Sequence, residues 1–110
     1  MKPLPPFERE ARLLSELQRL YEDDVTPGEL LRTLRKQVLG FSQERYAALA
    51  GISRRTLSDI EQDKESASLN TLNRAFMPLG LKAGLLPRQN TMMQQLLHQL
   101  SHKDEANDDT

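Results

Sequence analysis

The chain has 110 residues, 37% of them apolar and 28% charged, which suits one small domain with a modest core. It has no cysteine, so disulfides, thiolate catalysis and thiolate metal ligands are excluded. The net charge of −1 is unevenly distributed: residues 1–25 carry four basic and six acidic groups, residues 26–90 ten and six, and residues 91–110 one and four. The middle segment is therefore net +4 between ends of −2 and −3, and this local excess of basic charge favours an anionic ligand.

Residues 1–25 are predicted to form an N-terminal extension with one amphipathic helix at about 7–23. Prolines at positions 3, 5 and 6 disfavour an earlier start, and apolar side chains then recur at spacings of three and four. These side chains are Leu13, Leu14, Leu17, Leu20 and Tyr21. The beginning has no apolar stretch typical of a secretory signal, and no apolar run is long enough to span a membrane, so a soluble, cytoplasmic protein is expected.

Residues 26–80 are predicted to form the central helical domain. Four helices are expected, at about 27–38, 43–50, 54–62 and 69–79, and Pro78 should kink or end the last one. Each helix follows a residue that can cap its N-terminus: Thr26, Ser42, Ser53 and Ser68. The side chains expected to face inward are Leu30, Leu31, Leu34, Val38, Tyr46, Ala47, Leu49, Ala50, Leu57, Ile60, Leu69, Leu72, Ala75, Phe76 and Leu79.

The C-terminal part begins with a weak strand signal at residues 81–88, where Leu81, Ala83 and Leu85 alternate with other residues. One strand cannot satisfy its own backbone hydrogen bonds, so we expect it to pair with a second copy in a dimer. Residues 89–110 are predicted to form an amphipathic helix followed by an acidic, disordered tail. The apolar face of that helix consists of Met93, Leu96, Leu97 and Leu100.

Two histidines in the final helix, His98 and His102, lie four residues apart, a spacing that can bind a metal ion. No third ligand is well placed, although Asp104 and Glu105 are near, so no metal site and no cofactor are predicted. The sequence also has no glycine-rich phosphate loop, no nucleophile elbow and no recognisable pair of carboxylates in an apolar pocket. The chain is therefore not predicted to be an enzyme.

The segment "GISRRTLSDIEQDK", residues 51–64, places two arginines where a helix begins. The partial positive charge of a helix N-terminus makes Arg54 and Arg55 cost roughly a few tenths of a kcal/mol each. Two short helices joined by "AGIS" are typical of a helix-turn-helix, whose second helix enters the DNA major groove with its N-terminus first. Arginine there can bind guanine O6 and N7, so DNA would offset the cost. The predicted base-reading residues are Arg54, Arg55, Ser58 and Asp59.

In these residues the chain resembles the Xre-type helix-turn-helix family, which includes the phage repressors and Cro. The resembling stretch is "LGFSQERYAALAGISRRTLSDIEQDKESASLNTL", residues 39–72. The resemblance implies an all-α fold with a five-helix DNA-binding domain in residues 26–80, to which this chain adds terminal helices and the short strand. It also implies that Gln43, and Ser68 and Asn70 at the start of the next helix, contact DNA phosphate. The basic Arg32 and Lys64 are predicted to contact phosphate as well.

The family pattern also implies a partly buried ion pair between an arginine of the first domain helix and Glu61. Arg35 is preferred to Lys36 for this pair, although its spacing to Gly40 looks one residue longer than usual. The role of Asp59 stays open. It could accept a hydrogen bond from cytosine N4, or it could hold Arg55 in place.

A weaker resemblance covers "LNTLNRAFMPLGLKAGLLPR", residues 69–88, which is similar to HipB-like antitoxins. In that group a short strand pairs across a dimer two-fold. The resemblance implies a homodimer that binds double-stranded operator DNA, represses its own operon and binds a HipA-like kinase toxin. The alternatives are a free-standing Xre-type regulator and a module mainly for protein–protein interaction. Exposed apolar stripes on the terminal helices would favour a protein partner.

Overall fold

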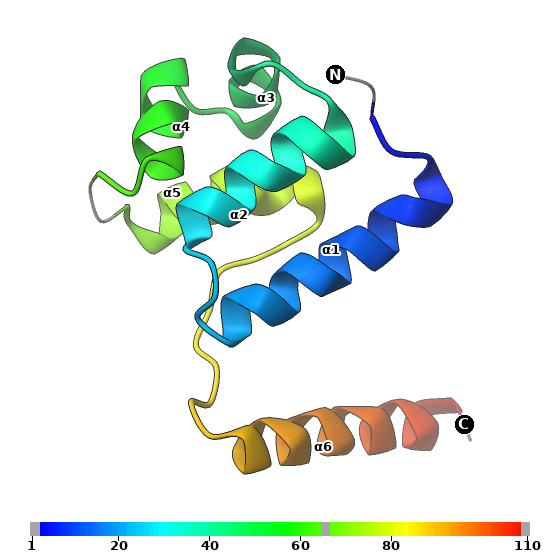
Figure 1. Cartoon of the computed structure of the whole chain (residues 1–110). Coiled ribbons are helices and arrows are strands. Elements are labelled where there is room, and N and C mark those ends of the chain that lie inside the picture. Colours follow the sequence, from blue (N-terminus) through cyan, green and yellow to red (C-terminus); the bar gives the residue numbers. More distant parts are fainter. Residues whose placement is uncertain (1–2, 65–66, 109–110) are drawn as a thin grey trace.

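The computed structural model describes residues 3–64 and 67–108, with side chains as far as residue 103. Its six α helices are α1 (Pro6–Tyr21), α2 (Pro27–Thr33), α3 (Gln43–Ala50), α4 (Arg54–Glu61), α5 (Leu69–Phe76) and α6 (Asn90–Asp108) (Figure 1). A π-helical turn, η1 (Leu34–Leu39), continues α2, and a 3-10 turn, η2 (Met77–Leu79), continues α5. None of the helices in this part of the chain is long and apolar enough to cross a membrane.

Helices α1 to α5 form the body of the molecule, and α6 lies apart from them (Figure 1). Helix α2 contacts both α1 and α4, while α3 contacts α4, α5 and η2. The core formed between these helices consists of Leu30, Leu31, Leu34, Val38, Tyr46, Ala47, Ala50, Leu57, Ile60, Ala75 and Phe76. All eleven were expected to face inward, so the helical period of the sequence predicted this core correctly.

Hydrogen bonds at the helix starts confirm all four predicted N-caps. Thr26 Oγ1 accepts from the Glu29 N–H of α2, and the hydroxyl oxygens of Ser42, Ser53 and Ser68 accept from backbone N–H groups in the first turns of α3, α4 and α5. Each cap satisfies a donor that the helix leaves without an internal partner. Helices of seven or eight residues need such local help, because short helices are marginal by themselves.

Two leucines predicted to face inward are exposed: Leu49 on α3 is 60% exposed and Leu69 on α5 is 59% exposed. Leu14, on the predicted apolar face of α1, is 60% exposed as well. A short helix buries only one narrow stripe, which in α3 is set by Tyr46 and Ala50, and Leu49 projects outside it. Leu69 is the first residue of α5, at the edge of the packed region.

The number of helices between residues 26 and 80 also differs from the expectation of five. The described residues form four α helices there, and the segment after α5 is only the 3-10 turn η2. Pro78 lacks the N–H that would continue α5, and Gly80 ends the turn in the left-handed conformation with φ of 73°. The domain thus has four α helices and two short turns, with α1 and α6 outside it.

The unusual spacing before Gly40 has a structural explanation in η1. The Gly40 N–H donates to the carbonyl of Arg35, five residues earlier, as in a π-helical turn. A π turn takes up one more residue than an α turn, and it is frequent where a functional side chain must be placed. The longer spacing is therefore absorbed without ending the helix, and Arg35 stays on the buried face.

A contact that the sequence did not predict joins the start of α2 to the end of α4. Asp63 adopts a positive φ of 54°, and its carboxylate accepts from the Thr26 hydroxyl at 2.6 Å and from the Gly28 N–H at 3.1 Å. A Cβ on Gly28 would lie 2.3 Å from the Ile60 carbonyl oxygen. Glycine is thus required at this position, because the two helix ends meet backbone to backbone.

Helix α1 packs against α2 and η1 rather than standing free. The Leu4 N–H donates to the Val38 carbonyl at 3.1 Å, and Arg12 donates to the Gln37 side chain. Glu16 is buried on this helix and forms ion pairs with Arg12 and Arg19 at 3.2 and 3.4 Å. Helix α1 therefore carries one buried carboxylate, which two arginines of the same helix partly neutralise.

Tyr46 joins α3 to α5 inside the core. Its side chain is fully buried, and its hydroxyl donates to the Ala75 carbonyl. Burial raises the pKa of Tyr46, the nearby Glu61 carboxylate raises it further, and Arg35 opposes the shift. The phenol therefore stays protonated, and remains a hydrogen-bond donor, far above neutral pH.

The predicted strand at residues 81–88 is wrong for the single chain. Residues 81–87 are irregular: Leu81 donates its N–H to Phe76, Ala83 donates its N–H to the Asn73 side chain at 2.8 Å, and Leu85 is 98% exposed. No strand occurs in residues 3–64 or 67–108 with which this segment could form a ladder.

The acidic tail differs from expectation as well. Helix α6 continues through it as far as Asp108, whereas disorder was expected from residue 103. The segment 103–108 holds no glycine or proline that would end a helix. The last two residues of the predicted tail, 109 and 110, lie outside the described part.

The close approach at Gly28 gives a direct test of the α2–α4 contact. Gly28→Ala should lower the free energy of unfolding by about 1–3 kcal/mol, because its Cβ would push against the Ile60 backbone. Gly84→Ala is the matched control, since no atom lies within 4 Å of its added Cβ, and its effect should stay within about 0.5 kcal/mol. Urea unfolding measures both. Equal effects of the two substitutions would contradict the contact.

Candidate nucleic-acid interface

Helices α3 and α4 meet through a tight turn at Gly51. This residue has a φ of 72°, a left-handed conformation that glycine adopts without strain, and no atom crowds the position of its missing Cβ. The Ile52 N–H donates to the Ala47 carbonyl at 3.1 Å, and Ile52 is half-buried against the core. Ser53 then caps α4. These residues produce the expected geometry of two short helices joined by a sharp turn.

Helix α4 buries Leu57 and Ile60 and turns its other face outward. Arg54 and Arg55 are exposed in its first turn. Ser58 and Asp59 are half-buried further along, and Ser58 accepts a hydrogen bond from the Gln62 side chain at 3.2 Å. The four predicted base-reading residues thus lie on one short helix.

Arg55 forms no ion pair or hydrogen bond with any described side chain, so Asp59 does not hold it in this structure. Arg54 has a weak partner: its Nη1 lies 3.9 Å from Oε1 of Glu44 on α3, and both side chains are largely exposed. An exposed pair at that distance contributes at most about 1 kcal/mol. Both arginines are therefore available to an external anion.

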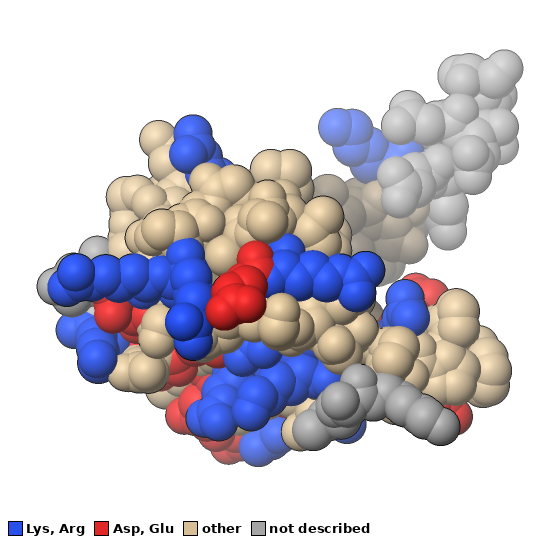
Figure 2. All heavy atoms as spheres, turned by 90° about the horizontal axis from the view of Figure 1, so that it is seen from above, with Lys and Arg blue, Asp and Glu red and all other residues tan. Residues whose placement is uncertain are grey.

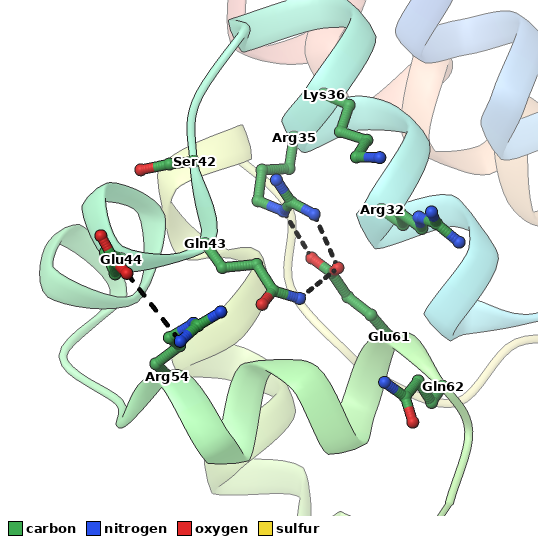
Figure 3. Close-up of a pocket in the computed structure, with 9 residues that line it drawn as sticks. All are labelled: Arg32, Arg35, Lys36, Ser42, Gln43, Glu44, Arg54, Glu61 and Gln62. Carbon is green, nitrogen blue, oxygen red and sulfur yellow. Dashed lines mark hydrogen bonds and ion pairs between the residues drawn. The ribbon is translucent and has the colours of Figure 1, made fainter.

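A basic hollow of about 380 Å³ lies beside the first turn of α4 (Figure 3). Arg32 and Lys36 border it from α2 and η1, Arg54 borders it from α4, and Gln43 lies between them. Three cations from separate elements thus border one concave surface. The hollow includes the predicted phosphate contacts Arg32 and Gln43, and it adds Lys36.

The floor of this hollow is a buried ion pair. Arg35 Nε donates to Glu61 Oε2 at 2.7 Å and Arg35 Nη2 donates to Glu61 Oε1 at 2.8 Å, and both side chains are at most 5% exposed. Figure 3 shows that Gln43 Nε2 also donates to Glu61, at 3.1 Å. Arg35 Nη1 donates in addition to the Phe41 carbonyl at 2.8 Å. Of the two candidates for this pair, Arg35 contacts Glu61 in the structure; Lys36 lines the same hollow and forms no ion pair with that carboxylate.

The network connects three helical elements. Arg35 belongs to η1, Gln43 begins α3, and Glu61 ends α4. The two-point contact between a guanidinium and a carboxylate is directional, so it fixes orientation as well as distance. With the Asp63 contact to Gly28, α4 is held to α2 and η1 at two places near its C-terminal end.

The remaining predicted phosphate contacts lie beyond the C-terminal end of α4. Lys64 and Asn70 are exposed, on either side of residues 65 and 66, which lie outside the described part. The Ser68 hydroxyl caps α5 and also hydrogen-bonds with Thr71, which leaves its contact with DNA a prediction. None of the three lines the basic hollow.

Basic side chains are widespread on the face that carries α3 and α4. Figure 2, seen from above relative to Figure 1, shows several groups of Lys and Arg there, with an acidic group between two of them. Among the described residues, no group of three or more His, Cys, Asp or Glu side chains is placed to hold a metal ion.

Sequence reasoning missed Gly28, Asp63 and Glu44. The first two meet across a gap of 35 residues, and no local pattern indicates such a contact. The Glu44–Arg54 pair likewise depends on the angle between α3 and α4. The only sequence signal for the first contact was Gly28 itself, because glycine in the first turn of a helix weakens the helix and so indicates a close approach there.

Comparison with known proteins identifies relatives of the helix-turn-helix part. The chain is 38% identical over 60 residues to the HTH-type transcriptional regulator PuuR of Escherichia coli (strain K12) and to that of Shigella flexneri, over 54% of this chain and 32% of each relative. It is 28% identical over 81 residues to the immunity repressor protein of Bacillus phage phi105, over 74% of this chain and 56% of that protein. The chain thus spans about a third to about half the length of these relatives, and no solved structure matches it.

None of these three names mentions an antitoxin, so the HipB-like assignment and the HipA-like partner stay predictions from sequence. The Xre-type resemblance, in contrast, is supported by a family model. The family model of the helix-turn-helix family HTH_3 matches residues 31–85, which include the turn at Gly51, the whole of α4 and the ion pair. That match covers half of the chain, and the protein belongs to this Xre/Cro-like helix-turn-helix family.

Proposed function

We propose that the protein is a sequence-specific DNA-binding transcriptional regulator that acts as a repressor. The observation that carries this proposal is the pair of exposed arginines in the first turn of α4, on a helix that is fixed to the rest of the domain by a buried ion pair. Family membership supports it, as do the names of the relatives, which are transcriptional regulators and an immunity repressor.

In the proposed complex, α4 enters the major groove with its N-terminus first. Arg54 and Arg55 then reach base edges, where each guanidinium can donate two hydrogen bonds to one guanine. Ser58 and Asp59, one turn further along, meet neighbouring bases, and Asp59 can accept from cytosine N4. Because Asp59 does not pair with Arg55 in the free protein, the first of its two possible roles is the one we propose.

Phosphate contacts would surround the reading helix. One strand's backbone would lie over the basic hollow, where Arg32, Lys36 and Gln43 can donate to phosphate oxygens. Lys64, Ser68 and Asn70 would contact phosphates beyond the other end of α4, with help from the free N–H groups at the start of α5. Such contacts position the protein on the duplex and carry no sequence information themselves.

Glu44 would act on Arg54 before DNA is bound. In the free protein its carboxylate lies 3.9 Å from the Arg54 guanidinium, and it would repel phosphate. An approaching guanine offers Arg54 a shorter, two-point contact in place of this weak pair. A non-specific duplex with no acceptor at that position would leave the Glu44 repulsion uncompensated, which would favour discrimination between sequences.

A homodimer is the proposed active form. Backbone N–H groups of Lys82, Gly84, Leu85 and Leu86 donate no hydrogen bond to any described atom, and the side chains of Leu85 and Leu86 are exposed. They border an apolar groove of about 390 Å³ that α1, α2 and α5 also line. Pairing of two such segments across a two-fold axis would satisfy the backbone groups and cover both leucines. It would also give the two-fold symmetry with which dimeric helix-turn-helix proteins bind paired half-sites.

The antitoxin role is a second candidate, favoured by apolar side chains that the single chain leaves uncovered. Phe7 and Leu14 on α1 are 80% and 60% exposed, and Leu97 and Leu100 on α6 are about half exposed. A HipA-like kinase toxin could cover one of these faces. Co-purification with the product of the adjacent gene, before and after removal of residues 1–24 or 90–110, distinguishes an antitoxin from a free-standing regulator.

Substitution of the reading arginines tests DNA recognition. Arg54→Ala and Arg55→Ala should each weaken binding to a duplex selected from a random library by about 1–3 kcal/mol, and each should relax preference at one base pair. Gln43→Ala should weaken selected and scrambled duplexes alike. Arg88→Ala is the matched control, because it removes the same charge from an exposed position away from α4. Unchanged discrimination in both arginine variants would refute the assignment of α4 as the reading helix.

Sedimentation tests the proposed assembly. At micromolar concentration the protein should sediment at about twice its 12.6 kDa chain mass. Leu85→Asp should shift it toward monomer, because a charge would replace the most exposed leucine of the proposed interface. Phe7→Asp, an equally drastic change on α1, should leave the mass unchanged. A monomer that binds its selected duplex tightly would exclude the dimer.

A further inference from the structure

Helix α6 has a polar face that DNA recognition does not use. Residues 89–102 contain no Asp, Glu, Lys or Arg. Thr91, Gln95, His98 and His102 follow one another at spacings of four, three and four, so they lie along one side of the helix. All four side chains are exposed, and the apolar residues of α6 lie on the opposite side.

The side chains of the two histidines on this face contact each other through their Nε2 atoms. They are the chain's two histidines. Their ring centroids are 4.1 Å apart with the planes at 88°, and the two Nε2 atoms are 2.7 Å apart. At that separation the two Nε2 atoms share a hydrogen bond, so both rings present the same nitrogen to one small region. A metal ion that displaced this hydrogen bond, with the donor ring changing to its Nδ1–H tautomer, would find both Nε2 lone pairs available.

We propose that His98 and His102 form a bidentate chelate for a late first-row divalent metal ion, with Cu²⁺ preferred. Imidazole suits these metals, and histidines four apart on a helix present two nitrogens to one ion. Two nitrogens bound at about 2.0–2.1 Å lie about 2.9 Å apart in adjacent positions of a square-planar ion and about 3.4 Å apart in a tetrahedral one. The observed 2.7 Å is a hydrogen-bond distance, so the preference for Cu²⁺ rests on its position at the top of the usual affinity order.

The surface beside the pair is neutral. Among the described residues, no group of three or more His, Cys, Asp or Glu side chains is placed to hold a metal ion, so the two imidazoles are the ligands that we propose. Gln94, Gln95 and Gln99 line the adjoining surface with His98, and their neutral amides neither repel a cation nor hold it strongly. The absence of Lys and Arg from residues 89–102 spares a metal ion the repulsion that it would meet from the basic side chains of the middle segment.

Metal binding at this site would reinforce α6. The helix lies apart from the body of the molecule, so its stability depends largely on its own local interactions (Figure 1). An ion held by residues four apart bridges one complete turn, and it binds only when that turn is helical. Binding energy would therefore appear as slower opening of the backbone around His98 and His102.

Titration of the full-length protein with Cu²⁺ tests the chelate. One ion should bind per chain, with two equatorial imidazole nitrogens in its electron paramagnetic resonance spectrum. Amide exchange in α6 should slow when the ion binds. The variant His98→Gln with His102→Gln defines the background from other copper-binding groups, such as the terminal amine.

A variant that preserves composition provides the matched control. His102→Gln combined with Gln99→His keeps two histidines on α6 but turns them about 100° apart, onto different faces. Because linking two ligands raises effective affinity by 10² or more, this variant should bind Cu²⁺ about 10²-fold more weakly than the natural chain. Equal affinity of the two proteins, or a natural chain that binds no better than the background variant, would overturn the proposal.

Discussion

The buried ion pair between Arg35 and Glu61 is the interaction on which the placement of α4, the proposed reading helix, depends. Removing two charges from water is costly, and only near-ideal geometry and additional hydrogen bonds compensate for it. Both are present: two contacts of 2.7 and 2.8 Å join the pair, the Phe41 carbonyl accepts from Arg35, and Gln43 donates to Glu61. Neither partner can move without leaving a charge unpaired in the core, so the pair fixes α4 against η1 and α3. The π turn of η1 belongs to the same arrangement, because it absorbs the extra residue before Gly40 and keeps Arg35 on the buried side.

This attachment explains how a chain of net charge −1 can present two cations at a helix N-terminus. The C-terminal half of α4 is fixed by Glu61 and by the Asp63 contact with Gly28. Its first turn is capped by Ser53 and carries Arg54 and Arg55 outward. The stability that the arginines cost locally is recovered by the cap and by the core contacts of Leu57 and Ile60. The two arginines are thus not needed to hold α4 in place, and in the proposed complex the basic hollow beside them would contact the DNA backbone.

Much of the domain could be predicted from the sequence because its signals are local. Helical spacing identified all eleven core residues, and the four capping residues were read from composition and position alone. The predictions failed where the structure depends on packing between distant parts of the chain, or on pairing with a second chain. Leu49 and Leu69 fit the helical period yet lie outside the packed region, and the segment containing Leu85 forms no strand in a single chain. The Asp63–Gly28 contact and the convergence of Arg32, Lys36 and Arg54 join separate helices, so they became visible only in three dimensions. The exposed arginines and Gln43 were candidates from the motif, and their roles toward DNA remain proposals.

A thermodynamic cycle on the ion pair tests this account most directly. Arg35→Met and Glu61→Met, alone and together, can be compared by urea unfolding, with Lys36→Met as the control at the neighbouring half-buried cation, which forms no ion pair with a described side chain. Each single substitution at the pair should lower the free energy of unfolding by about 3–5 kcal/mol, because it leaves a buried charge without its partner. The double substitution should cost far less than the sum of the two, and Lys36→Met should change stability by less than about 0.5 kcal/mol. If Arg35→Met and Glu61→Met lowered the free energy of unfolding only slightly and additively, by no more than Lys36→Met does, the claim that this pair holds α4 in place would be contradicted.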